Sequence, residues 1–382
     1  MTATQTLTTP RIDPDPLSPL NQMQRYLVHE FVEDFRDGLL SRCDLMAKIG
    51  HIAGGATAAA AIMTWFGVSA AEVGAQEATP TATPIPAQSE FSVAADDPAV
   101  TTSEITYQSG GVSYTGYEAR PSPATTDPSP VADASPVSGA GGLVLVCHEN
   151  RGLTEHIRDV TRRLAVAGYV GFAIDLLSPE GGTDAQTDRS EIPAILTGGD
   201  FGRHPNAFKD AILHYDSLGD PAASAVGMIG FCLGGGVTWV TATQEPRLLA
   251  AVPFYGPPPP VESVPSITAA VLGIYSEDPG DFANEGRDEL AAALESAGIE
   301  HEIRVYPGTE HAFHNDTGPR FNEGQATAAW NDTLAWLSAN LATALRSQSP
   351  ARTEEGVSAG CAGSFSRQVG ARVAYVGSGL SM

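Results

Sequence analysis

The sequence predicts an α/β fold, with a doubly wound, mostly parallel sheet and helices on both of its faces. Two observations predict it. From residue 142 onward, short uninterrupted apolar runs alternate with segments of helical periodicity. One of these runs, residues 225–230, leads directly into a glycine-rich turn that can open a helix. Alternation of this kind is typical of parallel strands joined by right-handed crossovers.

The strands are expected where the apolar runs are four to eight residues long and rich in branched side chains. Leu143 to Cys147 is one such run, continuously apolar as in a strand buried on both faces. The expected strands are residues 143–147, 169–174, 225–230, 249–255, 269–275 and 301–306.

The helices are expected from apolar residues that recur on one side. Ile157, Val160 and Leu164 have this spacing, and Gly168 follows as a C-cap. The expected helices are residues 156–167, 205–218, 287–297 and 327–341, with one more opening after the glycine-rich turn.

Composition divides the chain into four parts. Residues 105–341 hold nearly all the strand and helix signals and form the expected catalytic domain. Residues 77–104 are rich in Thr and Pro and are expected to be a disordered linker. Residues 342–382 are rich in Ser, Gly and Ala and are expected to be a disordered tail. Residues 1–76 are expected to be an N-terminal signal or membrane-anchor region.

The N-terminal expectation depends on an uncharged run. Residues 49–71 contain no Asp, Glu, Lys or Arg and follow Arg42 and Lys48. Membrane attachment through this run, or cleavage near Ala75, would make the protein exported or membrane-anchored, and therefore extracytoplasmic. A buried hairpin of the globular domain is the structural alternative.

Charge and cysteine content limit the partners. The net charge of −24 argues against nucleic acid, because a phosphate backbone would be repelled. No spacing of Cys, His and Asp indicates a metal site, and no G-x-G-x-x-G indicates a dinucleotide cofactor, so neither is expected. Of the four cysteines, Cys147 and Cys232 lie in the expected domain, and a bridge between them is the structural rival to a catalytic thiol. A monomer is expected, although nothing in the sequence addresses oligomeric state.

The glycine-rich turn has the form of a nucleophile elbow with cysteine in the central place. Cys232 lies between Gly230 and Gly234, where a tight strand-to-helix turn leaves little room for side chains. The N-terminus of the following helix favours a thiolate or an oxyanion. Cys232 is therefore the candidate nucleophile, and a small buried residue in a common turn is the alternative reading.

Polar residues follow the other strands at their carboxyl ends, where active sites of such sheets lie. Glu149 follows the first strand, Asp278 and Asp281 follow the fifth, and His311 follows the sixth. Nucleophile, acid and histidine in this chain order are the pattern of α/β-hydrolases. A histidine can take the proton of a thiol near neutral pH, and a carboxylate can hold its ring in the required tautomer.

Four segments together resemble the dienelactone hydrolase family over residues 105–341. They are residues 146–153 (VCHENRGL), 168–177, 230–235 (GFCLGG) and 306–313 (YPGTEHAF). The resemblance implies an α/β-hydrolase fold and a carboxymethylenebutenolidase-like cleavage of small lactones or esters. It implies Cys232 as nucleophile and His311 as base, with Glu149 bonded to the resting thiol. It also implies an oxyanion hole made by the N–H groups of Leu233 and Asn150.

Two features depart from the family pattern. The family places its aspartate where this chain has Pro279, so Asp278 or Asp281 must serve instead; Asp278 is favoured because it is nearer the strand end, and Asp281 stays open. The family also holds a substrate carboxylate with arginines, one of them at the position of Asn315. The candidate replacements are Arg151, Arg189, Arg203 and Arg320.

Two further functions stay open at this point. A broad carboxylesterase or thioesterase would use the same residues. An exported binding protein could keep the fold without the chemistry, because function depends on the site and not on the architecture.

Overall fold

A single sheet organises the chain. The computed structural model describes residues 15–68, 87, 89–123 and 141–348, and these contain an eight-stranded sheet of order β1-β2-β4-β3-β5-β6-β7-β8. β1 and β2 run antiparallel to each other and β2 runs antiparallel to β4, whereas all other neighbours are parallel. The strands are β1 (Val100–Ser109), β2 (Val112–Pro121), β3 (Leu143–Cys147), β4 (Val170–Ile174), β5 (Val226–Phe231), β6 (Leu248–Phe254), β7 (Ala270–Ser276) and β8 (His301–Tyr306).

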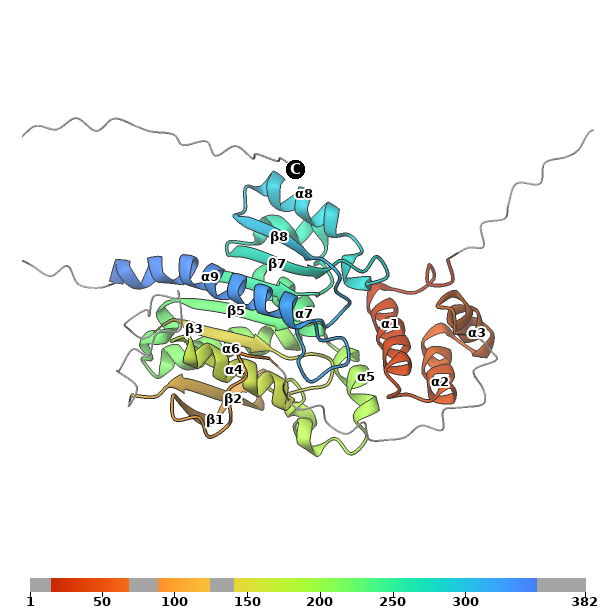
Figure 1. Ribbon diagram of the computed structural model, residues 1–382, viewed down its shortest axis with the longest axis horizontal. Coiled ribbons are helices and arrows are strands. Elements are labelled where there is room, and N and C mark those ends of the chain that lie inside the picture. The colour runs from red at the N-terminus through yellow and green to blue at the C-terminus, as the bar shows by residue number, and fades with distance from the viewer. Residues whose placement is uncertain (1–14, 69–86, 88, 124–140, 349–382) are drawn as a thin grey trace, which may run out of the picture. The chain divides into compact units, whose positions relative to one another are not determined.

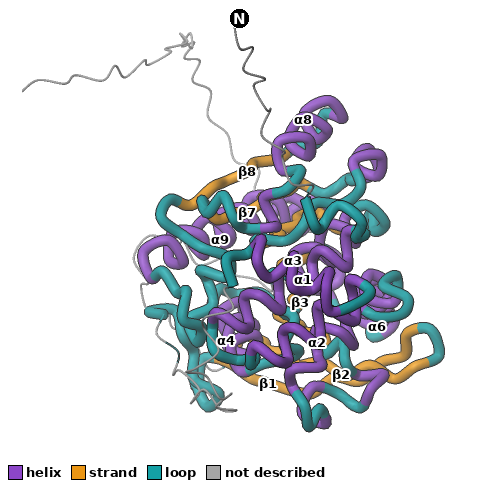
Figure 2. The backbone as a smooth tube through the Cα atoms, turned by 90° about the vertical axis from the view of Figure 1, so that its right-hand side faces the viewer, coloured by secondary structure: helices purple, strands orange, loops and turns teal. Residues whose placement is uncertain are grey.

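Helices lie on both faces of this sheet. Figure 2 shows α4 and α9 on one side of the strands and α6 on the other. α7 packs beside α6 and against β5 and β6. The predicted α/β-hydrolase architecture is confirmed. The helices are α1 (Gln22–Arg36), α2 (Arg42–Ala53), α3 (Ala56–Trp65), α4 (Glu155–Val166), α5 (Ile192–Thr197), α6 (Arg203–Ser217), α7 (Leu233–Ala242), α8 (Arg287–Ala297) and α9 (Glu323–Gln348).

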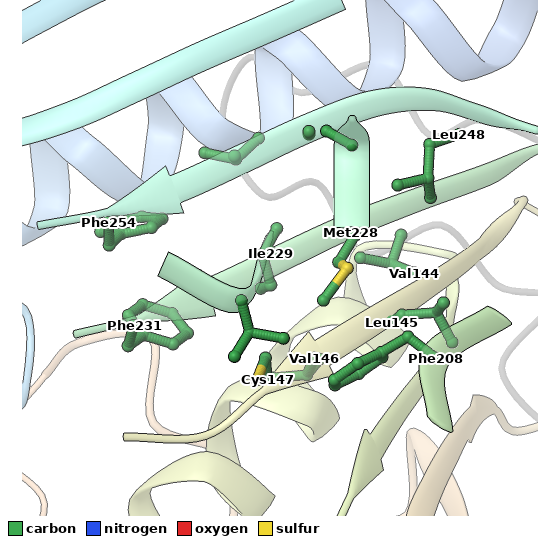
Figure 3. Packing of buried hydrophobic residues seen from close by; sticks show 14 of the residues in the cluster. Val144, Leu145, Val146, Cys147, Phe208, Met228, Ile229, Phe231, Leu248 and Phe254 are labelled. Carbon is green, nitrogen blue, oxygen red and sulfur yellow. The ribbon is translucent and has the colours of Figure 1, made fainter. Parts of the chain in front are cut away.

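The core lies around the central strands β3 and β5. Every residue of these two strands is buried, because helices cover both faces. Aromatic and branched side chains from β3, β5, β6 and α6 pack together (Figure 3), and the rings of Phe231 and Phe254 lie 4.6 Å apart. In the register of the sheet Cys147 pairs with Gly230, so β3 and β5 end at the same level. The segments after Cys147 and after Phe231 therefore meet at one edge.

The β1–β2 hairpin was not predicted. Its two-residue turn is Gly110-Gly111, with φ of 57° and 80°, which glycine adopts without strain. β1 begins at Val100, inside the segment expected to be a linker. The residues just before it are also bound to the domain, because Ser92 Oγ donates to Asp316 and the N–H of Val93 donates to Asp159. These contacts and strand β1 correct the linker expectation over residues 77–104 from residue 89 onward. Residues 77–86 and 88 lie outside the described part of the chain.

The N-terminal region forms helices α1, α2 and α3. They share a small apolar core that includes Phe31, Leu45, Ile49 and Ile62. The uncharged run is divided between α2 and α3, which are bent by 113° at Gly54 and Gly55. In the part of the chain that the structure describes, no single helix is long and apolar enough to cross a membrane. Among these described residues, only α2 and α3 taken together have the length and composition of a membrane span. The expected cleavage site near Ala75 lies outside the described residues, so export or anchoring stays a prediction.

The last helix extends beyond its predicted end. It was expected over residues 327–341, and α9 runs from Glu323 to Gln348. The first seven residues of the expected tail are therefore helical, and residues 349–382 lie outside the described part of the chain.

Candidate active site

Cys232 occupies a strained turn between β5 and α7. Its backbone has φ 55° and ψ −117°, which a residue with a side chain rarely adopts. The two flanking glycines are required by close packing. A Cβ on Gly230 would lie 2.2 Å from the carbonyl oxygen of Gly234, and one on Gly234 would lie 2.4 Å from that of Cys147. This is the geometry of a nucleophile elbow, in which the central side chain is held at the edge of the sheet.

Two side chains of helix α1 contact the thiol. Cys232 Sγ donates a hydrogen bond to Glu30 Oε1 over 3.1 Å, and the hydroxyl of Tyr26 lies 3.4 Å from Sγ. Burial, with the nearby Glu30 carboxylate, raises the pKa of Cys232 to about 12. The cysteine therefore rests as a neutral thiol.

Glu30 is itself unusual. It is buried, and burial followed by the charge of Glu33 raises its pKa to about 7. Its second oxygen accepts a hydrogen bond from the side-chain amide of Asn150. α1, which carries Glu30, begins at a reciprocal capping box formed by Asn21 and Gln24.

His311 follows β8 and is oriented by Asp281. His311 Nδ1 and Asp281 Oδ1 lie 2.9 Å apart, and both residues are buried. The carboxylate is in turn held by the hydroxyl of Ser276 at 2.5 Å and by the N–H of Ala283 at 2.9 Å. Burial by itself would lower the pKa of His311. The negative charge of Asp281, with smaller contributions from neighbouring acidic groups, outweighs burial and raises the pKa of His311 well above its ordinary value.

The other ring nitrogen is left for the thiol. A ring nitrogen of His311 lies within 4.8 Å of both Cys232 Sγ and a Glu30 oxygen. Nε2 is buried and has no hydrogen-bond partner among the described residues. A histidine in this position can accept a proton from the thiol. The same three ligand atoms, from Glu30, Cys232 and His311, are close enough together to hold a metal ion.

The structure distinguishes the two aspartates that the sequence left open. Asp281 bonds the imidazole, whereas Asp278 accepts a hydrogen bond from the N–H of Gly280 at 2.8 Å. Asp278 thus stabilises the Asp-Pro-Gly turn that directs the chain back toward the histidine. Asp281 caps the short helical turn that follows, and its carboxylate lies beside Nδ1 of the imidazole.

The expected partner of the resting thiol is corrected. Glu149 is buried at the end of β3, but its Oε2 accepts from Asn315 Nδ2 at 2.7 Å. Its Oε1 has no hydrogen-bond partner among the described residues. The place beside Sγ belongs to Glu30, because α1 brings a second carboxylate there.

The two expected oxyanion donors flank the thiol. Leu233 is the first residue of α7, where a backbone N–H has no partner within the helix. Asn150 is buried after β3 at the same edge of the sheet. Their positions are compatible with the donor pair that the resemblance implies.

The candidate arginines separate into two groups. Arg151 and Arg320 line a cavity of about 340 Å³ that Cys232 and His311 also line. Arg203 and Arg189 do not line it. Arg203 pairs with Glu180 at 2.5 Å and Arg189 lies 3.6 Å from Asp184, so salt bridges elsewhere explain both.

The acidic contacts from α1 were missed by sequence reasoning. Glu30 is 202 residues away from Cys232 in the chain, and no local motif joins them. The available signal was the spacing of Val28, Phe31 and Val32 in α1, which predicts an amphipathic helix rather than an anchor. The two domain cysteines are free, so the alternative of a bridge between them is excluded.

Comparison with known proteins places this geometry in a family. The dienelactone hydrolase family model matches residues 132–341, more than half of the chain. The chain belongs to the dienelactone hydrolase family. The helices α1, α2 and α3 precede the matched residues.

Individual proteins with similar sequences support this family membership. The "Putative carboxymethylenebutenolidase" of Salmonella typhi is 34% identical over 231 residues, covering 56% of this chain and 84% of that protein. The Escherichia coli (strain K12) protein of the same description is 32% identical with the same coverage. A solved structure described as "Putative Dienelactone Hydrolase", from Klebsiella pneumoniae, is 28% identical with a TM-score of 0.54, covering 63% of this chain and 99% of its own. The family and these relatives identify the chain as a hydrolase of esters or lactones.

Proposed function

We propose that this dienelactone hydrolase family member cleaves small lactones or esters through the thiol of Cys232, by way of an acyl-enzyme. One observation carries the proposal: a cysteine in a strained elbow lies beside a histidine whose far nitrogen bonds a buried aspartate. A histidine beside the thiol can act as its base, and a carboxylate on the far nitrogen orients the histidine for that role.

The first half of the reaction forms the acyl-enzyme. In its neutral form, His311 takes the proton of the thiol at Nε2 as Sγ attacks the carbonyl carbon of the ester or lactone. The carbonyl oxygen becomes an oxyanion, for which the N–H groups of Leu233 and Asn150 are the proposed donors. When the tetrahedral adduct collapses, the alkoxide leaves and receives the proton from His311. Asp281 stabilises the imidazolium that forms between these steps.

The second half releases the acid. Water gives a proton to His311 and attacks the thioester carbonyl. Collapse of this adduct expels the thiolate, which recovers the proton from the imidazolium. The carboxylic acid departs and the enzyme returns to the state in which Cys232 bonds Glu30.

Glu30 is proposed to keep the thiol protonated between turnovers. Its negative charge beside Sγ favours the neutral thiol. A substrate that takes the space beside Sγ must displace this carboxylate, and the thiol then loses protons more easily. A buried neutral thiol also resists oxidation, which would suit the exported or membrane-anchored location that the N-terminal run suggests.

Hydrolysis of 4-nitrophenyl acetate tests the proposal. We expect Cys232→Ala to lower kcat/KM by about a thousandfold or more, because Cys232 is the cysteine grouped with His311 among the described residues. Cys43→Ala is the matched control, since Cys43 is exposed and does not line the cavity. Wild-type rates in a folded Cys232→Ala protein, shown by an unchanged circular dichroism spectrum, would overturn the thiol mechanism.

A further inference from the structure

One face of α1 borders the active-site cavity with carboxylates. Glu30, Glu33 and Asp34 recur at the spacing that puts side chains on one side of a helix, and Asp37 continues the row at the helix end. All four line the cavity that reaches Cys232. We call these four residues the acidic wall.

The acidic wall pairs with both arginines of the cavity. Arg151 donates to Asp34. Arg320 donates to Glu33 and, over 3.1 Å, to Asp37. A guanidinium that is already bonded to a carboxylate of the chain is a poor receptor for a carboxylate of the substrate.

Negative charge remains in excess after these pairings. The cavity is lined by five carboxylates, two guanidinium groups and the His311 imidazole, so acidic groups outnumber basic ones. They are Glu30, Glu33, Asp34, Asp37 and Glu149, with Arg151, Arg320 and His311. Like charges brought together in a partly desolvated cavity repel strongly, so an anionic substrate pays a cost there that a neutral one does not.

Two carboxylate oxygens of the cavity lining lack a hydrogen-bond partner. They are Asp34 Oδ2 and Glu149 Oε1, each fully buried within the described residues, and Arg320 Nε is a buried donor of the same lining without a partner there. Their residues are 3% and 5% exposed. A buried acceptor without a partner is costly, and a ligand that brings an N–H, an O–H or a positive charge satisfies it.

We propose that the acidic wall makes this active site select esters and lactones whose acyl part is uncharged or cationic, and reject those that carry a carboxylate. The inference rests on the proposed ester or lactone hydrolysis. It gives α1 a specificity role that lies outside the residues matched by the family model. It also departs from the arginine-held substrate carboxylate that the family resemblance implies.

Three substrates of similar length test the charge preference. They are the 4-nitrophenyl esters of hexanoic acid, of adipic acid (as the monoester) and of 6-aminohexanoic acid, which end in a methyl, a carboxylate and an ammonium. At about pH 8, above the pKa values of about 7 for Glu30 and about 6 for Asp34, we expect kcat/KM for the adipate ester to be at least about tenfold below that for the hexanoate ester. We expect the aminohexanoate ester to be cleaved at least as well as the hexanoate ester.

A double variant then tests the wall itself. Glu33→Gln with Asp37→Asn leaves Arg320 without its charged partners. We expect the adipate-to-hexanoate ratio of kcat/KM to rise by about tenfold or more. Asp288→Asn with Glu289→Gln is the matched control, because it removes two exposed charges from α8 and should leave the ratio unchanged.

Each result decides the question. An equal rise on both esters would mean that α1 restricts entry regardless of charge, and would overturn the proposal. So would a wild-type enzyme that cleaves the adipate ester as well as the hexanoate ester. If hexanoate cleavage still requires Cys232, the proposed function survives that failure. Should the double variant not fold, competitive inhibition of the wild type decides: hexylamine should inhibit more strongly than hexanoate, and equal or weaker inhibition would overturn the proposal.

Discussion

At the scale of single residues, the site combines a buried thiol, an oriented histidine and a second carboxylate. Cys232 is bonded by Glu30 from α1, and His311 is bonded by Asp281 after β7. The opposing effects on the thiol are therefore separable, because Glu30 raises its pKa while His311 lowers it. Substituting Glu30 and Asp281 one at a time therefore separates the carboxylate that keeps the thiol protonated from the one that supports its deprotonation by His311.

Asp281→Asn should impair catalysis severely. An amide cannot stabilise the imidazolium and favours the wrong tautomer, so we expect kcat to fall by about 10²–10⁴-fold. Asp278→Asn is the control, since Asp278 only closes the neighbouring turn. Steady-state hydrolysis of 4-nitrophenyl acetate measures both. A larger loss of activity from Asp278→Asn than from Asp281→Asn would show that Asp281 is not the catalytic acid.

Glu30→Gln should make the resting thiol more reactive. Removal of the negative charge beside Sγ lowers the pKa of Cys232, which burial and Glu30 together raise to about 12. We expect alkylation of Cys232 by iodoacetamide at about pH 8 to accelerate by about tenfold for each unit of pKa lost. Glu262→Gln, on an exposed turn, should leave the rate unchanged. A rate equal to that of the wild type in Glu30→Gln would remove Glu30 from this role.

At the scale of elements, α1 is held to the domain by groups whose protonation changes near neutral pH. Burial first, then neighbouring acids, raises the pKa of Glu30 to about 7, while burial raises that of Asp34 to about 6 against the opposing charge of Arg151. The backbone of the elbow and its two glycines, by contrast, is held by close packing and by a hydrogen bond from the N–H of Cys232 to the carbonyl oxygen of Phe254 at 3.0 Å. The α1 contact is therefore expected to respond to pH in this range.

The contribution of Glu30 to stability should fall as pH rises through this window. An acid with a raised pKa binds more protons in the folded than in the unfolded state between its two pKa values, so the free energy of unfolding decreases from about pH 4.5 to about pH 7. For Glu30 the loss is on the order of 1–3 kcal/mol. Urea unfolding at about pH 5 and about pH 8 measures it. Glu30→Gln should flatten the dependence, and an identical dependence in the variant would contradict this origin.

At the scale of the whole molecule, the N-terminal region belongs to the active site. Tyr26 and Glu30 reach the thiol, and three ion pairs join α1 and Asp37 to the cavity arginines. The arrangement in Figure 1 places α1, α2 and α3 beside the edge of the sheet where these contacts form. A mature enzyme without these helices would have an exposed and unrestrained thiol.

Retention of α1 is therefore predicted even if the protein is exported. Cleavage near Ala75 would remove Glu30, so we expect any mature form to keep residues 22–36. Intact-mass measurement of the protein recovered from cells that produce it naturally reads its N-terminus directly. A mature chain that begins near Gln76 would contradict the role given to the acidic wall.

Much of this organisation could be predicted from the sequence, for identifiable reasons. The strands at 143–147 and 301–306 and the helix at 287–297 were predicted with the bounds observed, because their apolar runs and glycine caps are local signals. Cys232 and His311 follow from motifs with fixed spacing. Asp281 could not be separated from Asp278, because a turn geometry decides it. Glu30 could not be found, because its contact with the thiol depends on packing between distant segments.

The most direct test of thiol catalysis compares modification with activity in the same sample. Partial treatment with iodoacetamide yields preparations in which mass spectrometry gives the fraction of Cys232 alkylated, with Cys43, Cys147 and Cys361 quantified alongside. We predict that hydrolysis of 4-nitrophenyl acetate falls in proportion to the alkylated fraction of Cys232 and not of the other cysteines. Full activity in a preparation whose Cys232 is completely alkylated would contradict the mechanism.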